Sequence, residues 1–149
     1  MQNKIIAFSS DHGGFRLKQK LIDYVKTLGY QVVDLGPETD EIPISYAEQG
    51  HKLAHYINDK HPDFGIAMCG TGLGIYSYAL NRHKHIRAAR VVSIEDAHFA
   101  KLHNDANVLV FGGRQIAFED AKKIIDEYIH TKYEGGRHQI RIDQLDIEE

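Results

Sequence analysis

One stretch near the middle of the chain, residues 65–75, limits the possible folds more than any other. A short apolar run ends at Cys69, and glycines then occupy alternate positions before an apolar-periodic segment resumes: Gly70, Gly72 and Gly74. This order predicts a buried strand, a tight turn and the start of a helix. Glycines let the backbone approach a ligand closely, and the free amides of a starting helix carry partial positive charge. We therefore expect the turn to hold an anion or a developing oxyanion.

The position of Cys69 is consistent with two roles. The positive field at the start of a helix favours a thiolate, which would make Cys69 a base or a nucleophile. A free cysteine is also commonly an inert core residue. The local sequence leaves this second interpretation open.

The order of strand, turn and helix recurs along the whole chain. Short apolar runs predict strands at residues 5–8, 31–35, 65–69, 86–92 and 107–111. Helical periodicity predicts helices at 15–28, 45–59, from the glycine turn to 82, at 93–103 and at 121–129, with a short one around 137–141. This alternation predicts a three-layer α/β/α, Rossmann-like fold with a five-stranded parallel sheet and a C-terminal helical tail. Residues 1–149 are expected to form a single domain.

Charge and composition narrow the classes of function. The chain has 18 basic and 21 acidic residues, a formal net charge of -3 and no basic stripe, which argues against nucleic-acid binding. Its single cysteine cannot form an internal disulfide, its first residues lack a signal pattern, and no apolar run reaches membrane-spanning length. We expect a cytoplasmic protein that does not bind a membrane.

Polar side chains follow three of the predicted strands. Asp11 and His12 come after the first strand, Cys69 and Thr71 after the third, and Arg114 after the fifth. The carboxyl ends of parallel strands meet at one edge of the sheet, where ligands bind if neighbouring connections leave on opposite faces. We therefore expect these side chains to line one site.

His103 and Asn104 lie where a predicted helix returns to a strand, which places them at the opposite edge of the sheet. They cannot easily reach Cys69 within the same chain. If they belong to the same site, a second subunit must supply them, and a two-fold homodimer with shared active sites is the simplest arrangement. The alternative is that both residues merely end a helix.

Five segments, taken together and in order, resemble one protein family. They are 10–14 (SDHGG), 69–74 (CGTGLG), 103–108 (HNDANV), 112–114 (GGR) and 133–141 (YEGGRHQIR). In these segments, which extend over nearly the whole chain, the sequence is similar to the family of ribose-5-phosphate isomerase B, galactose-6-phosphate isomerase and allose-6-phosphate isomerase.

The resemblance implies an aldose–ketose isomerase that needs no metal or other cofactor. It implies that Cys69 is the base that moves a proton between carbon 2 and carbon 1 through an enediolate. Ribose 5-phosphate would become ribulose 5-phosphate, a step of the pentose phosphate pathway. His103 would open the sugar ring, and Asp11 and Asn104 would hold hydroxyls or the ring oxygen. A thiolate suits general-base work, and Thr71 and the glycine amides suit the oxyanion.

The resemblance also implies a site for the phosphate of the sugar. It would consist of His12, Arg114, Arg137 and Arg141, because guanidinium groups match phosphate geometry. Arg137 and Arg141 are one turn apart in the predicted tail helix and face the same way. Members of the family are dimers or dimers of dimers with sites at the subunit boundary, which agrees with the placement of His103.

Some residues differ from the family pattern. Ile42 precedes Pro43 where the family often has a tyrosine, and Tyr46 is the candidate replacement that would contact the sugar. Tyr76 and Tyr78 are bulkier than the residues usual at their positions. Allose 6-phosphate and galactose 6-phosphate therefore stay open as substrates. A non-catalytic, flavodoxin-like phosphate-binding module is the alternative outside the enzymes.

Two further patterns favour simpler interpretations. His51 and His55 have the spacing of a zinc pair on a helix, but no third ligand is near them in the sequence, so we expect a solvated helix face and no metal site. The glycines of the two strand–turn–helix segments do not match G-x-G-x-x-G, so a dinucleotide cofactor is not expected.

Overall fold

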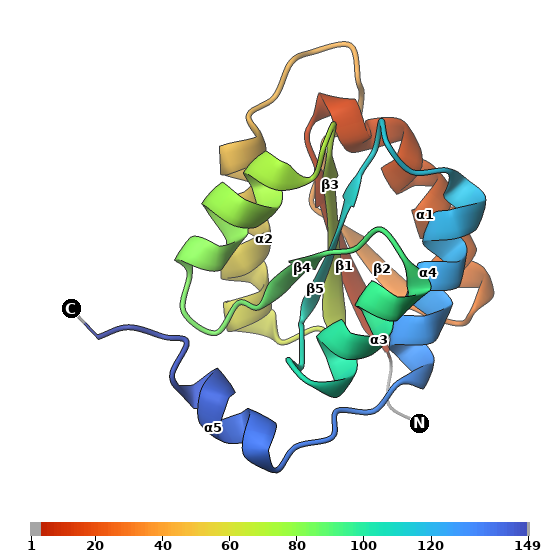
Figure 1. The fold of residues 1–149 in the computed structure, drawn as a ribbon. Coiled ribbons are helices and arrows are strands. Elements are labelled where there is room, and N and C mark those ends of the chain that lie inside the picture. The colour runs from red at the N-terminus through yellow and green to blue at the C-terminus, as the bar shows by residue number, and fades with distance from the viewer. Residues whose placement is uncertain (1–3, 149) are drawn as a thin grey trace.

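Five parallel strands form the central sheet of the computed structural model, which describes residues 4–148. Their order across the sheet is β2-β1-β3-β5-β4 (Figure 1). The strands are β1 (Ile5–Ser10), β2 (Gln31–Asp34), β3 (Phe64–Cys69), β4 (Ala88–Arg90) and β5 (Val108–Gly112). The topology confirms the predicted α/β fold with a five-stranded parallel sheet.

Strand β4 is shorter than the predicted range of 86–92. It is an edge strand that pairs only with β5. The backbone N–H of Arg87 donates to the side-chain oxygen of Asn107 (2.7 Å), and that of Ala88 donates to the side-chain oxygen of Asn81 (2.9 Å). The Arg87 bond extends the pairing with β5, because Asn107 directly precedes that strand, whereas the Asn81 side chain pairs with Ala88 on the side of β4 that has no strand neighbour.

Helices connect the strands and cover the sheet. They are α1 (Phe15–Thr27), α2 (Tyr46–Lys60), α3 (Ile94–Leu102), α4 (Phe118–His130) and α5 (Arg137–Asp143). Two of them begin with serine caps. Ser45 Oγ accepts from the N–H of Glu48 (3.2 Å), and Ser93 Oγ accepts from the N–H of Asp96 (3.0 Å). No helix between residues 4 and 148 is long and apolar enough to cross a bilayer.

The segment that follows Cys69 is helical as predicted, but it is not an α-helix. It is a π-helix over Gly74–Ala79, followed by a 3₁₀ turn over Leu80–Arg82. Helix α2 packs closely against it, since a Cβ atom added to Gly50 would lie only 2.5 Å from Cβ of Ala79. Tertiary packing of this kind overrides helical propensity and is not visible in the periodicity of the segment.

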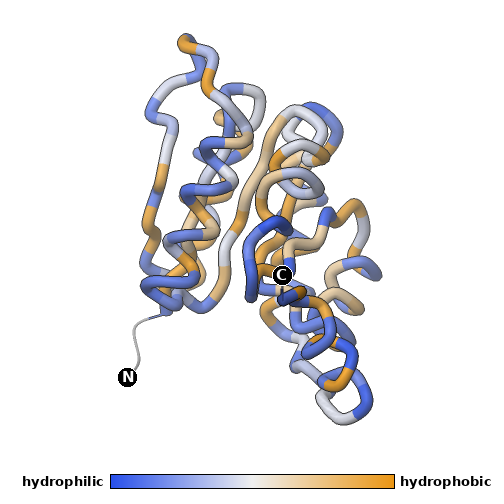
Figure 2. The backbone as a smooth tube through the Cα atoms, turned by 90° about the vertical axis from the view of Figure 1, so that its left-hand side faces the viewer, coloured by the Kyte–Doolittle hydropathy of each residue, from blue (hydrophilic) through white to orange (hydrophobic). Residues whose placement is uncertain are grey.

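The two faces of the sheet are covered by different helices. Side chains of α1, α3 and α4 pack on one face against alternate strand residues such as Phe8, Met68 and Phe111. Helix α2 and residues 74–82 cover the other face, on which Cys69 lies. Figure 2 shows that the helical coils alternate between hydrophilic and hydrophobic residues, whereas the central strand between them is mainly pale to orange. The core is thus two apolar layers separated by the sheet.

Connections leave the carboxyl ends of neighbouring strands on opposite faces. The connections after β1 and β5 lead to α1 and α4 on one face, while the connection after β3 leads to residues 74–82 on the other face. Crevices therefore lie on both sides of the end of β3, which is the expected place for a ligand in such a sheet. Helix α5 lies beyond the opposite edge (Figure 1).

Candidate active site

The turn after β3 brings backbone amides to the sulfur of Cys69. The N–H of Gly72 donates to Sγ of Cys69 (3.1 Å). Gly72 has φ +79°, and a Cβ atom there would lie 3.1 Å from the backbone of Phe111, so glycine is required at this position. Thr71 Oγ1 accepts from the N–H of Leu73 (3.2 Å). The turn therefore holds a backbone donor against the sulfur.

Cys69 is also packed into the core. Only 4 % of the residue is exposed, and it belongs to the apolar cluster under α2 together with Ala67 and Ile75. Cys69 therefore has little contact with solvent in the single chain. The sequence leaves two interpretations of Cys69 open, and the structure has a feature of each. Burial is typical of an inert core residue, and the amide donor to Sγ is typical of a reactive one.

The loops after β1 and β5 lie against this turn through their glycines. The N–H of Gly113 donates to the carbonyl of Cys69 (2.7 Å), and the N–H of Arg114 donates to the carbonyl of Gly70 (3.0 Å). Guanidinium nitrogens of Arg114 lie 3.2–3.4 Å from the points where Cβ atoms of Gly13 and Gly70 would be. The Arg114 charge therefore lies over the crevices beside β3.

Asp11 and His12 follow β1 at the same edge. Asp11 Oδ1 accepts from the N–H of Gly14 (3.1 Å) and so caps the turn that precedes α1. His12 Nδ1 accepts from the N–H of Ile44 (3.1 Å), so a neutral His12 ring carries its proton on Nε2. Nε2–H is then a donor for a bound anion. The ring of Tyr46 lies on Gly74, because a Cβ atom at Gly74 would be 2.6 Å from that ring.

Two residues at this edge have structural roles that sequence reasoning did not assign. Arg90, the last residue of β4, donates from Nε to the carbonyl of Thr71 (2.8 Å) and from Nη2 to Oε1 of Gln115 (2.6 Å). Arg90 and Gln115 therefore hold the turn after β3 in place from the side of β4 and β5. The sequence did contain a signal for Arg90. It is an arginine near the carboxyl end of a predicted strand, at the same edge of the sheet as Cys69.

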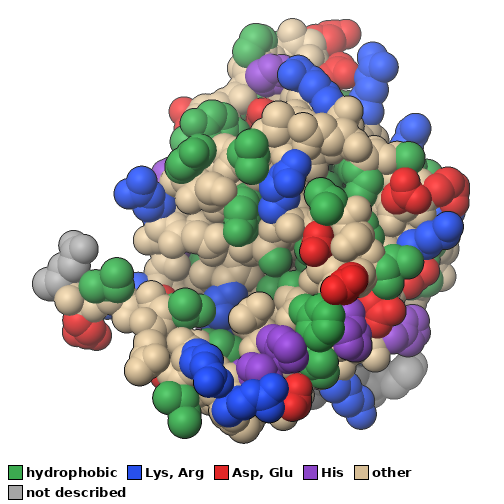
Figure 3. Space-filling view, in the orientation of Figure 1, with side chains coloured by type: hydrophobic (Ala, Val, Ile, Leu, Met, Phe, Trp, Pro, Cys, Tyr) green, Lys and Arg blue, Asp and Glu red, His purple; other side chains and the backbone are tan. Residues whose placement is uncertain are grey.

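The other predicted site residues lie at the opposite edge of the sheet. His103 ends α3 and stacks on His138 of α5, with ring centroids 4.3 Å apart and an interplanar angle of 17°. Arg137 and Arg141 are exposed on α5, and Nη1 of Arg141 donates to the carbonyl of Arg137 (2.9 Å). Figure 3 shows histidine, basic and acidic side chains gathered on the lower part of the molecule. One chain thus separates the predicted residues into two groups, as the predicted topology requires.

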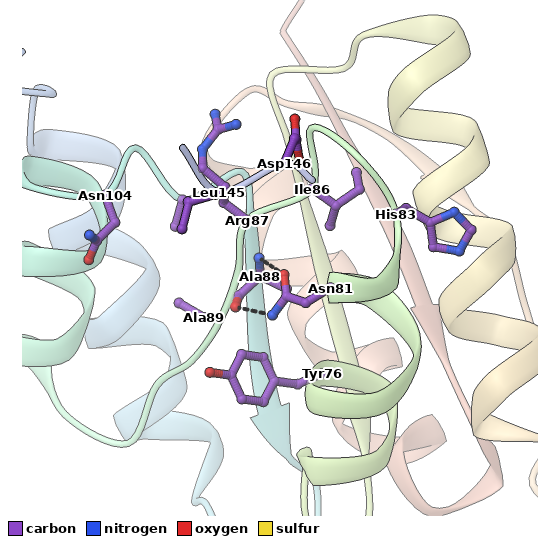
Figure 4. A pocket seen from close by; sticks show the side chains of 11 residues that line it. Tyr76, Asn81, His83, Ile86, Arg87, Ala88, Ala89, Asn104, Leu145 and Asp146 are labelled. Carbon is purple, nitrogen blue, oxygen red and sulfur yellow. Dashed lines mark hydrogen bonds between the residues drawn. The ribbon is translucent and has the colours of Figure 1, made fainter. Parts of the chain in front are cut away.

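Asn104 belongs to this second group and lines a pocket of about 350 Å³ beside β4. Tyr76 and Leu145 also line this pocket (Figure 4). Asn81 stabilises the wall of the pocket, because the amide nitrogen of its side chain donates to the carbonyl of Ala88 (3.0 Å). Cys69 does not line the pocket, so this cavity and the glycine turn are separate features of the single chain.

A third histidine lies beside the pair that the sequence singled out on α2. His51 Nδ1 lies 2.6 Å from Nε2 of His83, and the ring centroid of His55 is 5.0 Å from that of His83. Burial lowers the pKa of His83, and the nearby charges of His51 and His55 lower it further. The sequence around His51 and His55 did not indicate this neighbour, because the turn after residues 80–82 brings His83 back to α2.

Comparison with known proteins decides the family. The family model described as Ribose/Galactose Isomerase matches residues 6–145. The chain belongs to this isomerase family. Ribose-5-phosphate isomerase B of Escherichia coli is 39 % identical over 142 residues, which are 95 % of this chain and 94 % of the relative. The predicted family is therefore confirmed, and the chain is an isomerase and not a non-catalytic binding module.

Solved structures of the isomerase family have the same fold. A ribose 5-phosphate isomerase from Thermotoga maritima is 41 % identical, with a TM-score of 0.92 over 97 % of this chain and 99 % of that one. Ribose-5-phosphate isomerase B from Mycoplasma genitalium, solved with bound ribulose 5-phosphate, is 36 % identical, with a TM-score of 0.90 over 97 % of this chain and 95 % of that one. The chain is thus a full-length match to sugar phosphate isomerases.

Proposed function

We propose that this chain interconverts ribose 5-phosphate and ribulose 5-phosphate. The relatives from Escherichia coli, Thermotoga maritima and Mycoplasma genitalium all have the name of this activity, and the last holds ribulose 5-phosphate. The observation that carries the proposal is the hydrogen bond from the Gly72 amide to the Cys69 sulfur at the carboxyl end of the central strand. It gives the chain a candidate base at the place where a ligand is expected.

The proposed chemistry is a proton transfer by Cys69. Its thiolate removes the proton from carbon 2 of the open-chain aldose, and the electrons form an enediolate. The thiol then returns the proton to carbon 1, while the proton of the carbon 2 hydroxyl moves to the oxygen on carbon 1. The amides of Gly70, Gly72 and Gly74, together with the Thr71 hydroxyl, stabilise the negative oxygen. A positioned base of this kind contributes about 10²–10⁴-fold to the rate.

The proposed phosphate site needs groups from both edges of the sheet. His12 offers Nε2–H, and Arg114 offers a guanidinium beside the glycine turn. Arg137 and Arg141 lie on α5 at the other edge and would come from a second copy of the chain. Four groups that donate hydrogen bonds would then surround the phosphate dianion.

The same second copy would supply His103 and Asn104. His103 would open the sugar ring by proton transfer, while Asp11 of the first copy and Asn104 of the second would hold hydroxyls or the ring oxygen. Large apolar side chains on α3 and α5 are exposed, including Phe99 (41 %) and Ile140 (66 %). A partner subunit would cover such residues. We therefore propose a homodimer with two shared sites, either alone or paired into a dimer of dimers.

Tyr46 bears on the size of the sugar. Its ring lies on Gly74 beside the turn, and we propose that it contacts the end of the substrate distant from the phosphate. This placement favours the five-carbon sugar over allose 6-phosphate and galactose 6-phosphate, because a bulky ring shortens the space beyond the reacting carbons.

The experiment is an isomerisation assay of the wild type and Cys69→Ala with all three sugar phosphates. We expect the wild type to prefer ribose 5-phosphate and the variant to lose activity by about 10²–10⁴-fold, the usual contribution of a general base. Calorimetry with inorganic phosphate serves as the control, because the variant keeps every proposed phosphate ligand. A fully active Cys69→Ala would contradict the role of base, and a preference for a hexose phosphate would contradict the substrate.

A further inference from the structure

Three side chains at the edge opposite Cys69 form a compact group of possible metal ligands. His103 comes from the end of α3, Glu134 from the connection after α4, and His138 from α5. One ligand atom from each residue lies within 4.8 Å of those of the other two. Residues from three parts of the chain therefore converge on one point.

The distances in this group are too long for hydrogen bonds and close to those around a metal ion. Oε2 of Glu134 lies 3.5 Å from Nε2 of His138 and 3.9 Å from Nε2 of His103. Ligand atoms bonded tetrahedrally to Zn²⁺ at their usual distances are roughly 3.4 Å from one another. The rings of His103 and His138 are stacked, with an interplanar angle of 17°, so one imidazole must turn about its side-chain bonds before both nitrogens bond to one ion.

His138 contributes a buried nitrogen without a hydrogen-bond partner among the described residues. His138 is only 8 % exposed, and its Nε2 makes no hydrogen bond even though Glu134 is 3.5 Å away. A buried polar atom without a partner costs free energy, so it needs an explanation. A cation held between Nε2 and the carboxylate would supply the missing interaction.

Local structure holds the three ligands in place before any ion binds. The N–H of Glu134 donates to the carbonyl of Leu102 (2.9 Å), next to His103. The other carboxylate oxygen of Glu134, Oε1, lies 3.5 Å from the guanidinium of Arg137, so Oε2 is the one that faces the histidines. The charge of Arg137 opposes a bound cation and will lower its affinity.

We propose that His103, Glu134 and His138 form a binding site for Zn²⁺. Two imidazoles and one carboxylate are a common zinc ligand set that leaves a fourth position for water, whereas Mg²⁺ and Ca²⁺ prefer oxygen ligands. Zinc at this site occupies the imidazole of His103. On the proposed function, in which His103 opens the sugar ring, Zn²⁺ is therefore an inhibitor of turnover and not a cofactor.

Calorimetry of Zn²⁺ binding to the chelator-treated full chain tests the site directly. The His51→Gln/His83→Gln background removes the competing histidine cluster on α2. We expect one zinc ion per chain in this background, and we expect added Glu134→Gln or His138→Gln to weaken binding by more than about tenfold. Arg137→Gln should tighten binding, which a variant that fails to fold cannot do. Unchanged affinity in both ligand variants, or no binding in the double-variant background, would overturn the proposal.

An activity assay tests the inhibitory consequence separately. Zn²⁺ should slow turnover of ribose 5-phosphate in proportion to its measured occupancy. The residual activity of His138→Gln should resist the same concentration of Zn²⁺. Equal inhibition of that variant would place the inhibitory ion elsewhere, for example at Cys69, and overturn this part. If the chain does not isomerise ribose 5-phosphate at all, the proposed function fails while the calorimetry still decides the zinc site.

Discussion

At the scale of single residues, the sulfur of Cys69 is shaped by two opposing features of its surroundings. The Gly72 amide donates a hydrogen bond to it at 3.1 Å, whereas the apolar cluster under α2 packs around it and shields it from water. The donor is fixed by a backbone conformation that only glycine adopts readily. The proposed role of Cys69 as a base therefore depends on the glycine turn keeping its shape.

The glycines in the adjoining loop give a test of this close packing. A Cβ atom at Gly14 would lie 2.5 Å from Cγ of Met68, whereas one at Gly13 would have its nearest neighbour at 3.2 Å. We expect Gly14→Ala to lower the free energy of unfolding by about 1–3 kcal/mol, as overpacking usually does. Gly13→Ala is the matched control and should cost less. Urea denaturation measures both, and equal losses would contradict the packing that we describe.

The sequence was sufficient to predict the turn but not the residues that support it. Alternate glycines after an apolar run predicted the turn at Cys69, because few other structures need that spacing. The contacts of Arg90 with Thr71 and Gln115 depend on β4 lying beside β5, and strand order is not contained in local periodicity. Long-range neighbours of this kind require the folded chain.

At the scale of elements, packing between helices explains where the sequence prediction was incomplete. The apolar residues after Gly74 predicted a regular helix to Arg82, whereas the close approach of Gly50 to Ala79 accompanies a π-helix and a 3₁₀ turn. The cap at Ser93 is a local feature, because it depends on residues three positions apart in the sequence, and the same is true of the cap that the structure shows at Ser45.

The contact between α1 and α4 makes the free energy of unfolding depend on pH in the alkaline range. The Tyr24 hydroxyl donates to Oδ1 of Asp126 (2.5 Å). Burial, and then this bond to Asp126, raise the pKa of Tyr24 from 10.0 to about 12. Between these values the folded chain keeps a proton that the unfolded chain loses, so the free energy of unfolding falls as pH rises.

We therefore expect Tyr24→Phe to lose less stability than the wild type between pH 10 and 12. Lys18, whose pKa is lowered by burial, contributes with the opposite sign but is present in both proteins and cancels in the comparison. Tyr78→Phe, at an exposed tyrosine, is the control and should follow the wild type. Thermal melts across this range measure the difference, and parallel curves for Tyr24→Phe and the wild type would contradict the assignment.

At the scale of the whole molecule, the residues of the proposed site are divided between two edges of one sheet. Cys69, Arg114 and their neighbours lie at the carboxyl edge, whereas His103 and the arginines of α5 lie at the other edge. The alternation of strands and helices predicted this separation for His103, because a helix returns to a strand there, whereas it did not place the arginines of α5. The stacking of His103 on His138 could not be predicted, because His103 precedes α4 in the sequence and His138 follows it.

A mixed dimer tests most directly the central claim that two copies of the chain complete each site. Differently tagged Cys69→Ala and His103→Ala chains, each nearly inactive alone, are coexpressed and the mixed dimer is purified by both tags. One of its two sites then has both intact residues, so we expect about half of the wild-type rate per dimer. A mixed dimer no more active than either parent would contradict shared sites and the division of the active site between subunits.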